Sequence, residues 1–333
     1  MLEGLLVTNL TEKVYSSYVE VSVRIDNGVL FGMEAAKFGG HEGFPLRPVW
    51  PLKLVRALEH NPAALAQEDA SATFGVGKNM VTSMRHWGVL GGLIEPDPEM
   101  RHGMRPTFLG NLLFGGDAPL DPYFESPSTS WILHHRLATY NSGNTVFGWF
   151  FGRFARPSFN RPSLYDSILG DLPKLSAGRN VSPNTVRKDI DLMLRSYLPL
   201  SQQSEVSTVE DTAYASPLSD LSLIRVSRTG QYELNKPTPS HVPLGILLVA
   251  IFEYWSVHLR RARTITFDSL MFPVNAPGRL MVMRPEQLAE ALEALDTQRI
   301  GIRYDETAGV RSIAIDPRFA DRPNGEWISS AYN

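Results

Sequence analysis

The sequence predicts an α+β fold that is mainly α-helical and contains small β-hairpins. Several segments place apolar residues at three- and four-residue spacing, which is the period of a helix buried on one face. Short apolar or alternating runs that turn at glycine follow some of these segments and are typical of hairpins. The order helix, turn, helix and hairpin occurs twice. It predicts tandem winged helix-turn-helix-like units, joined by an aromatic helical block between residues 126 and 154.

Composition sets limits on the class of protein. The chain has 333 residues, of which 43% are hydrophobic, enough for two or three domains. Lys and Arg number 32 against 35 Asp and Glu, so the net charge of −3 provides no general basic excess. Any nucleic-acid contact must therefore come from local basic patches. The absence of cysteine excludes disulfides, thiolate metal ligands and cysteine nucleophiles, and we expect a cytoplasmic protein.

We expect no membrane association. The N-terminus has no basic leader before its short apolar run, so it does not resemble a secretory signal. The longest apolar stretch, residues 242–255, contains Pro243 and Glu253 and is shorter than the roughly 20 residues that span a bilayer. This stretch predicts a buried helix.

The chain divides into four predicted parts, each with its own set of elements. Residues 1–60 contain an N-terminal hairpin turning at Asp26 to Gly28, a His-Glu loop and a helix from Pro51 to His60. Residues 61–160 form the first winged-helix-like domain with a helical extension, and residues 161–240 form the second winged-helix-like domain. Residues 241–333 form a C-terminal helical domain with a closing hairpin from Arg299 to Ile315.

The first winged-helix-like unit contains a two-faced helix that begins near Gly77. Met80, Met84 and Trp87 share one face, while polar side chains project mostly elsewhere. A hairpin-like segment follows, so we expect this helix to bind DNA, with an ordinary helical hairpin as the alternative. The Gly-Val-Gly-Lys run lacks the spacing of a phosphate-binding loop. The predicted DNA-binding residues are Lys78, Asn79, Ser83, Arg85 and His86, of which Asn79 and Arg85 are the preferred base or phosphate contacts.

The second unit contains a similar helix. Ser182 is a good N-cap, and Pro183 suits the first helical position. Apolar residues from Val186 to Tyr197 form an inward stripe, and a hairpin is predicted between Leu221 and Leu234 after a polar, linker-like segment at 201–212. The residues expected to meet phosphates or bases are Asn184, Thr185, Arg187 and Lys188, together with Arg195.

Six motifs carry a resemblance to a known family. They are His41 to Arg47, Phe74 to Val81, Met84 to Trp87, Thr107 to Gly110, Asp121 to Glu125 and Trp131 to His135. Together they resemble a bacterial family encoded in DNA-phosphorothioation gene clusters, which includes the DNA-nicking component of Ssp-type defence systems, and the similarity runs from about residue 30 to 315. The sequence departs from the family pattern at Gly43, where threonine is usual, so a hydroxyl is missing there.

The resemblance implies a DNA nickase that opens a strand for sulfur incorporation. The implied partners are double-stranded DNA and the companion phosphorothioation machinery, namely a cysteine desulfurase, an ATP pyrophosphatase and an ATPase. The alternative is a non-catalytic winged-helix DNA adaptor that recruits this machinery. A third hypothesis is a conventional transcriptional regulator.

Phosphodiester cleavage normally needs divalent metal held by carboxylates, a base and a cation. The sequence contains no familiar nuclease motif. The first candidate set lies near a glycine-rich loop and comprises His41, Glu42, Arg47 and Lys53, with Glu42 as the metal ligand for Mg²⁺ or Mn²⁺ if the protein nicks DNA. The alternative is that His41 and Glu42 form hydrogen bonds within a structural loop.

Two further clusters have functional and structural interpretations. The carboxylates and histidines at Asp117, Asp121, Glu125, His134 and His135 could form a site, but Pro119 and Pro122 favour a polar loop beside core histidines. Arg260, Arg261 and Arg263 predict either a DNA or partner patch or the capping of a helix C-terminus.

Overall fold

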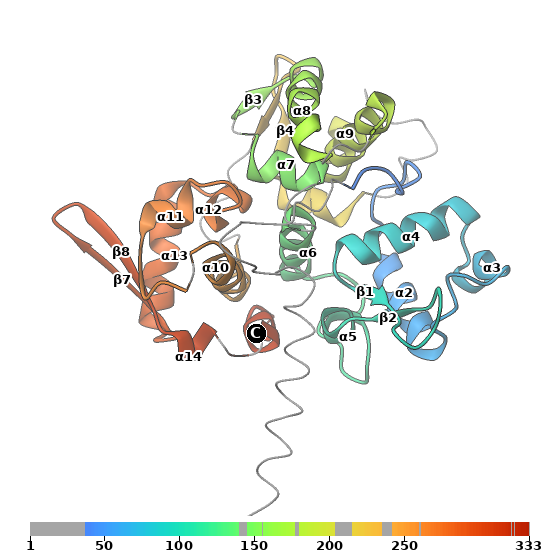
Figure 1. The fold of residues 1–333 in the computed structure, drawn as a ribbon, viewed down its shortest axis with the longest axis horizontal. Helices are drawn as coiled ribbons and strands as arrows, with labels where there is room; N and C mark the ends of the chain where they lie inside the picture. The colour runs from blue at the N-terminus through green and yellow to red at the C-terminus, as the bar shows by residue number, and fades with distance from the viewer. Residues whose placement is uncertain are drawn as a thin grey trace, which may run out of the picture.

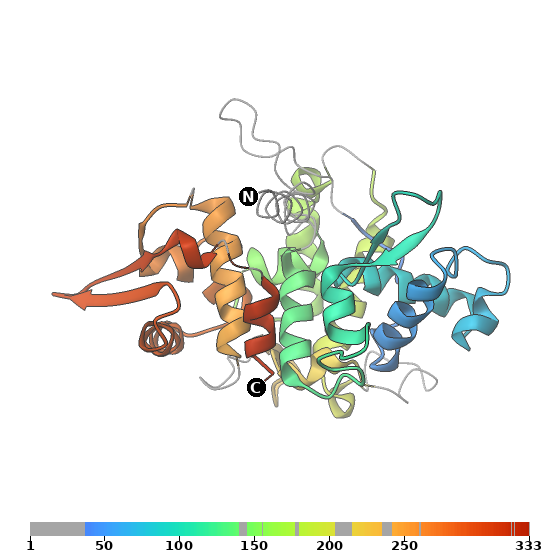
Figure 2. The same cartoon turned by 90° about the horizontal axis from the view of Figure 1, so that it is seen from below.

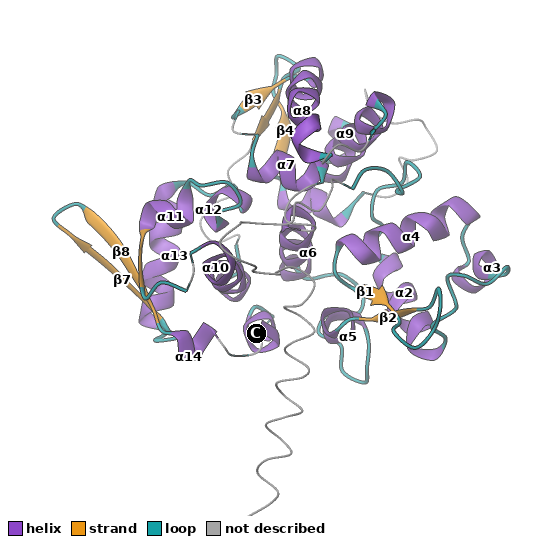
Figure 3. Ribbon diagram, in the orientation of Figure 1, coloured by secondary structure: helices purple, strands orange, loops and turns teal. Residues whose placement is uncertain are grey.

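The computed structural model describes residues 37–139, 145–154, 156–176, 180–203, 215–234, 242–259, 261–320, 322 and 324–332. The fold is α+β, as predicted, and helices dominate it (Figures 1 and 3). In these residues the strands form three small antiparallel sheets with the orders β1-β2, β3-β5-β4 and β6-β8-β7. The hairpin predicted around Asp26 to Gly28 and most of the 201–212 segment lie outside the described residues.

The first unit follows the predicted order of two helices and a hairpin. Gly75 ends its second helix in the left-handed conformation, with φ 64°, which glycine adopts without steric cost. The Met104 N–H donates to the Pro62 carbonyl at 2.8 Å and so joins the hairpin to the preceding loop. The elements are α3 (Ala70–Phe74), α4 (Lys78–Leu90), β1 (Ile94–Pro96), β2 (Met104–Pro106) and α5 (Phe108–Phe114), preceded by α2 (Val49–His60), which the sequence assigned to the part before this unit and which is counted with it here.

The second unit repeats this order and adds a strand. The Ser182 hydroxyl accepts a hydrogen bond from the Asn184 N–H, so the predicted N-cap is confirmed. The predicted hairpin is also present, with Ile224 opposite Leu234. The elements are α7 (Val146–Gly152), β3 (Ser158–Phe159), α8 (Arg161–Leu175), α9 (Pro183–Tyr197), the short 3₁₀ helices η2 (Leu200–Gln202) and η3 (Pro217–Leu221), β4 (Ile224–Val226) and β5 (Tyr232–Leu234).

The C-terminal part contains the expected buried helix and closing hairpin, together with a third strand. Its first strand pairs with its last, as in the second unit, so the helix-helix-hairpin order is present three times rather than twice. The elements are α10 (Leu244–His258), β6 (Thr264–Thr266), α11 (Phe267–Met271), α12 (Pro277–Leu280), α13 (Pro285–Thr297), β7 (Ile302–Thr307), β8 (Val310–Ile315), α14 (Pro317–Ala320) and α15 (Asn324–Ser330).

Helix α6 (Pro127–Thr139) stands at the centre of the molecule, between the first unit and α10 (Figures 1 and 2). The Ser130 hydroxyl donates to the Pro217 carbonyl at 3.0 Å, and the Ser128 hydroxyl donates to the Ala331 carbonyl at 2.6 Å. The predicted aromatic block is confirmed, because Trp131 on α6 and Trp149 and Phe150 on α7 are all buried. Within the described residues no helix is long and apolar enough to cross a membrane.

His134 of α6 joins the second unit to the C-terminal part. The Tyr197 hydroxyl at the end of α9 lies 2.7 Å from His134 Nδ1, and the Leu280 carbonyl at the end of α12 lies 2.9 Å from His134 Nε2. A carbonyl can only accept, so Nε2 carries the proton and Nδ1 accepts from the tyrosine. Burial lowers the pKa of His134 from 6.5 to about 4, which keeps the ring neutral.

We expect the free energy of unfolding to fall with acid through His134. The unfolded chain binds a proton below pH 6.5, but the folded chain does not until about pH 4. Stability is therefore complete above pH 6.5 and decreases towards pH 4, by on the order of 3 kcal/mol from this residue. Urea unfolding of the wild type, His134→Gln and the exposed control His102→Gln at pH 7.5, 5.5 and 4.5 measures this. A wild-type pH dependence in His134→Gln would contradict the assignment.

Candidate nucleic-acid interface

Helix α4 has the two faces that its sequence predicts. Met84 and Trp87 are buried against the core, while Lys78, Asn79 and Arg85 are exposed to solvent. The helix contains no acidic residue, so its exposed face carries two positive charges, an amide and the hydroxyl of Thr82. An anionic polymer would therefore meet no repulsive carboxylate from this helix.

Ser83 is wrong as an outward-facing DNA contact. Its side chain is 0% exposed, and its hydroxyl donates to the Phe44 carbonyl at 3.2 Å. The indole N–H of Trp87 donates to the same carbonyl at 2.9 Å. The loop before α2 covers this side of α4. The helical periodicity of apolar residues identifies one buried face of α4. It cannot predict that a loop distant in sequence covers a second face, on which Ser83 lies.

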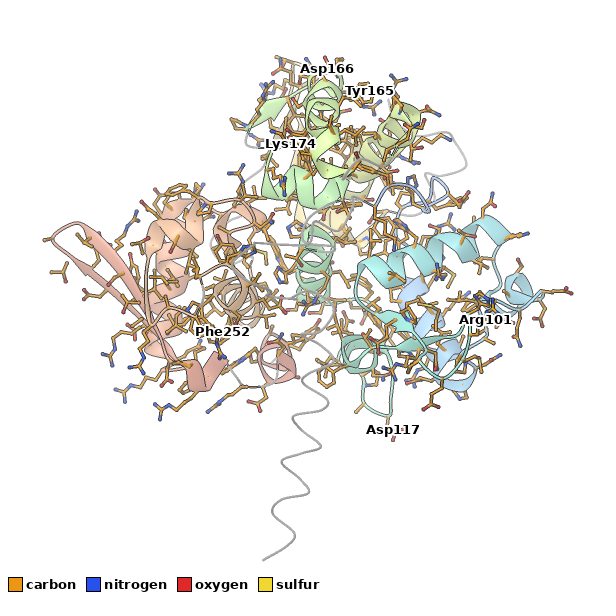
Figure 4. All side chains as sticks on the ribbon, in the orientation of Figure 1. Arg101, Asp117, Tyr165, Asp166, Lys174 and Phe252 are labelled. Carbon is orange, nitrogen blue, oxygen red and sulfur yellow. The ribbon has the colours of Figure 1, made fainter. Side chains whose placement is uncertain are left out.

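Helix α9 also has an exposed polar face. Asn184, Arg187 and Lys188 are exposed, and Thr185 is half-buried. The Arg187 guanidinium lies 4.8 Å from the centre of the Tyr165 ring on α8, and Figure 4 labels that residue beside α9. Arg195 is not an outward contact, because its Nη2 donates to the Gly43 carbonyl at 2.7 Å.

The segment between these two helices, residues 39–44, is called here the bridging loop. His41 within it is 5% exposed, and its Nε2 lies 2.8 Å from Asp189 Oδ1 on α9. The Gly43 N–H donates to His41 Nδ1 at 3.0 Å, so Nε2 is the protonated nitrogen that donates to Asp189. Both ring nitrogens are thus engaged within the protein, which is the geometry of the structural alternative for His41.

Asp189 is a member of this site that the sequence reasoning missed. It lies on the buried side of α9, where it also accepts from the Gly39 N–H at 2.9 Å. Its position three residues after Val186, on the inward stripe, is the signal that could have identified it. A carboxylate on an otherwise apolar face needs a partner inside the protein.

His86 packs behind the exposed face of α4. Its ring meets His41 edge-on at a centroid distance of 5.8 Å and Trp87 at 5.6 Å. The pKa of His86 is lowered from 6.5 to about 3, mainly by burial and to a smaller extent by the neighbouring His41 and Lys37. His86 is consequently neutral at physiological pH and adds no positive charge to this surface.

Of the other residues in the first candidate catalytic set, Glu42 is exposed, and Arg47 and Lys53 each contact a different part of the protein. Glu42 is exposed and has φ 50°, an uncommon value for a residue with a side chain. The Arg47 guanidinium lies 5.4 Å from the Trp50 ring centre, and Lys53 Nζ donates to the Phe74 carbonyl at 3.1 Å. Among the residues that the structure describes, no three His, Asp or Glu side chains are grouped so as to hold a metal ion.

The second candidate set is structural. Asp121 accepts from the Glu125 N–H at 2.7 Å and the Ser126 N–H at 3.0 Å, so it stabilises the start of α6. His135 Nε2 lies 2.8 Å from Glu253 Oε2 on α10. The polar loop and core histidines favoured by the sequence are confirmed, and Asp117 is exposed at the surface of the first unit (Figure 4).

The arginine cluster after α10 is only partly visible. Arg260 lies outside the described residues. The Arg261 guanidinium lies 5.3 Å from the Trp255 ring centre, and the Arg261 N–H donates to the Trp255 carbonyl at 3.3 Å. This arrangement fits a residue that packs at the C-terminal end of α10.

An open hollow of about 470 Å³ lies between α4 and the β1-β2 hairpin. Arg85 of α4 and Arg101 and His102 of the hairpin turn line it, together with Asp97. Asp97 Oδ1 accepts from the Glu99 and Met100 N–H groups, so that carboxylate stabilises the turn. The hollow extends the positive surface of α4 onto the hairpin.

Comparisons with known proteins give a family and a fold. The family model described as Protein of unknown function (DUF4007) matches residues 38–332. No curated protein matches this sequence. The structure titled "SspB crystal structure" is 24% identical with a TM-score of 0.73, covering 88% of this chain and 92% of that one. The "Magnesium ion-bound SspB crystal structure" is 23% identical with a TM-score of 0.72, covering 89% and 95%. This confirms, for the fold, the similarity to Ssp-type proteins predicted from the motifs.

We expect Gly40→Ala to destabilise the protein more than the matched variant Gly43→Ala. Gly40 has φ 90° and Gly43 has φ 83°, so each alanine costs about 1–2 kcal/mol in backbone strain. At Gly40 the new Cβ would also lie 3.1 Å from His86 Nδ1, whereas at Gly43 nothing lies within 4 Å. The extra contact should add ~1 kcal/mol in urea unfolding. Equal losses would show that the bridging loop is not packed tightly against α4.

Proposed function

The chain belongs to the family of proteins of unknown function DUF4007, and we propose that it is a DNA-binding protein of a bacterial DNA phosphorothioation and anti-phage defence system. Two observations support this placement: the six sequence motifs and the SspB-like fold. The implied setting is the cytoplasm, with double-stranded DNA and the cysteine desulfurase, ATP pyrophosphatase and ATPase of the modification machinery as partners.

The observation that carries the proposal is the pair of exposed polar helix faces on α4 and α9. Helix α4 follows α3 and precedes the β1-β2 hairpin, and α9 follows α8 and precedes the β4-β5 hairpin. A winged helix-turn-helix has the same order, and its second helix lies in the major groove of DNA. We assign Lys78, Asn79 and Arg85 on α4 to the DNA contact, with the neutral His86 behind them. On α9 the contacts are Asn184, Thr185, Arg187 and Lys188.

Charge separates these two helices from the corresponding helix of the C-terminal part. Helix α13 exposes Glu286, Glu290 and Glu293, which recur at helical spacing on one side. Such a face repels phosphates, whereas α4 and α9 attract them. We therefore propose that the DNA-binding surface lies on the first and second units and extends onto the first hairpin through the hollow lined by Arg85 and Arg101.

We expect Lys78→Ala and Lys188→Ala each to weaken binding of duplex DNA at physiological salt. A lysine that neutralises one phosphate contributes about 0.9 to the slope of log affinity against log salt, so each variant should lower that slope by about 1. Asn79→Ala should instead reduce discrimination between sequences. Fluorescence anisotropy across a salt series measures these effects, with Glu290→Gln on α13 as the control. Unchanged slopes in both lysine variants would remove α4 and α9 from the interface.

A second candidate function is sequence-dependent DNA nicking, with His41, Glu42, Arg47 and Lys53 as the proposed catalytic set. It is favoured by the magnesium-bound SspB structure and by the exposed Glu42, held at φ 50° between α4 and α9. Magnesium in nucleic-acid enzymes is commonly held by one or two carboxylates plus phosphate oxygens. The described residues supply only Glu42 at this loop and contain no grouped set of metal ligands, so they form no complete site for Mg²⁺ or Mn²⁺.

The nicking candidate predicts that the protein converts supercoiled plasmid to open circles with Mg²⁺ or Mn²⁺ present. Glu42→Gln should abolish the conversion, because it removes the carboxylate charge that would bind the metal. It should leave duplex binding intact, because the side chain keeps its size and the fold is unchanged. Glu68→Gln, an exposed glutamate of the first unit, is the matched control. Gel electrophoresis with the companion proteins added provides the readout. Plasmid that stays supercoiled while duplex binding persists would leave the non-catalytic adaptor as the function.

A further inference from the structure

We infer that the bridging loop fixes the separation and rotation of α4 relative to α9, so that the preferred DNA is a bipartite duplex site with a fixed spacing between two short sequence blocks. The inference rests on the proposed DNA-binding function and adds the class of site that is recognised. It also assigns Asp189 and Arg195 as positioning residues, which act through the loop and do not touch DNA.

The loop is tied to α9 by two side chains of that helix, the buried Asp189 and the half-buried Arg195. Asp189 accepts from the Gly39 N–H at 2.9 Å and from His41 Nε2 at 2.8 Å. Six residues further along, Arg195 donates to the Gly43 carbonyl at 2.7 Å. These contacts hold the loop at two levels of the helix, so they resist both sliding and tilting. Hydrogen bonds to charged partners are stronger than those between neutral groups.

The same loop is tied to α4 through one carbonyl. Phe44 O accepts from the Ser83 hydroxyl at 3.2 Å and from the Trp87 indole N–H at 2.9 Å. The two donors are four residues apart and so lie one above the other on the helix. The His41 ring also meets the His86 ring of α4 edge-on. Within six residues the loop therefore contacts both helices.

A second link joins the helices beneath the loop. The Phe147 ring of α7 packs at 5.7 Å from Trp87 of α4 and at 6.3 Å from Tyr197 of α9. Aromatic pairs prefer certain geometries, but these preferences are weaker than those of charge-assisted hydrogen bonds, so this link holds the two units together and fixes their rotation less firmly than the loop does. Loosening the loop should therefore release the rotation and leave the units joined.

If α4 and α9 are fixed relative to each other, the two DNA sequence blocks that they contact must lie a fixed number of base pairs apart. One turn of B-DNA takes 10–10.5 base pairs, so inserting one base pair rotates the second block by about a tenth of a turn. A rigid protein cannot follow that rotation with both helices, and one set of base contacts is lost. Losing even one base-pair contact lowers the affinity by roughly tenfold.

The test selects binders from random duplexes with the wild type, Asp189→Asn and Arg195→Gln. Asp191→Asn is the matched control, because Asp191 lies on α9 but faces Arg161 of the same unit at 3.8 Å. We expect the wild type to enrich two blocks at a single spacing and to lose about tenfold in affinity when one base pair is inserted. Asp189→Asn and Arg195→Gln should each keep both blocks but lose less than about threefold in affinity when the base pair is inserted. Asp191→Asn should behave as the wild type.

The outcomes separate this inference from the proposed function. A wild type that fails to bind any duplex in a salt-dependent manner would refute DNA binding itself. A wild type that binds but enriches one continuous block, or no block, overturns only the bipartite site. If Asp189→Asn and Arg195→Gln both select two blocks with a spacing as strict as that of the wild type, the bridging loop does not set the spacing.

Discussion

The contact between the second unit and the C-terminal part depends on one buried imidazole that must stay neutral. His134 accepts from Tyr197 of α9 and donates to the Leu280 carbonyl after α12, so it needs one bare and one protonated ring nitrogen. A second proton would leave the tyrosine facing a donor and place a charge in the core, where burial opposes it. Because α6 carries this ring at the centre of the molecule, its neutrality holds the second unit against the C-terminal part, and the other contacts of α6 reinforce that placement.

The three helix-helix-hairpin arrangements differ in charge more than in topology. The second and third share the same strand order, in which the first strand pairs with the last. Yet α4 carries no carboxylate, while α13 exposes three glutamates. A shared fold can therefore support different surface chemistry, and function has to be argued from the side chains. Comparison of the three surfaces is what confines the proposed DNA contact to the first two units.

Periodicity predicted α4 and α9 well, because each buries one apolar stripe and exposes the rest. Capping signals placed the start of α9 at the correct residue. Long-range contacts were not predictable in this way. Ser83, Arg195 and Asp189 all meet the bridging loop, which lies 39 to 152 residues away along the chain. No local pattern encodes such a partner, so Ser83 and Arg195 looked like surface residues, and Asp189 was overlooked as part of a buried stripe.

The distance along the chain between His41 and Asp189 has a kinetic consequence. The two residues are 148 positions apart, and the second is synthesised long after the first. Chains fold from the N-terminus during translation, and contacts between distant residues form slowly because a long loop must close first. The first unit is synthesised in full while the ribosome is still making α9. The glycine-rich segment before α2 would then wait without its carboxylate partner, and the final geometry of the interface would be reached only as a late docking event.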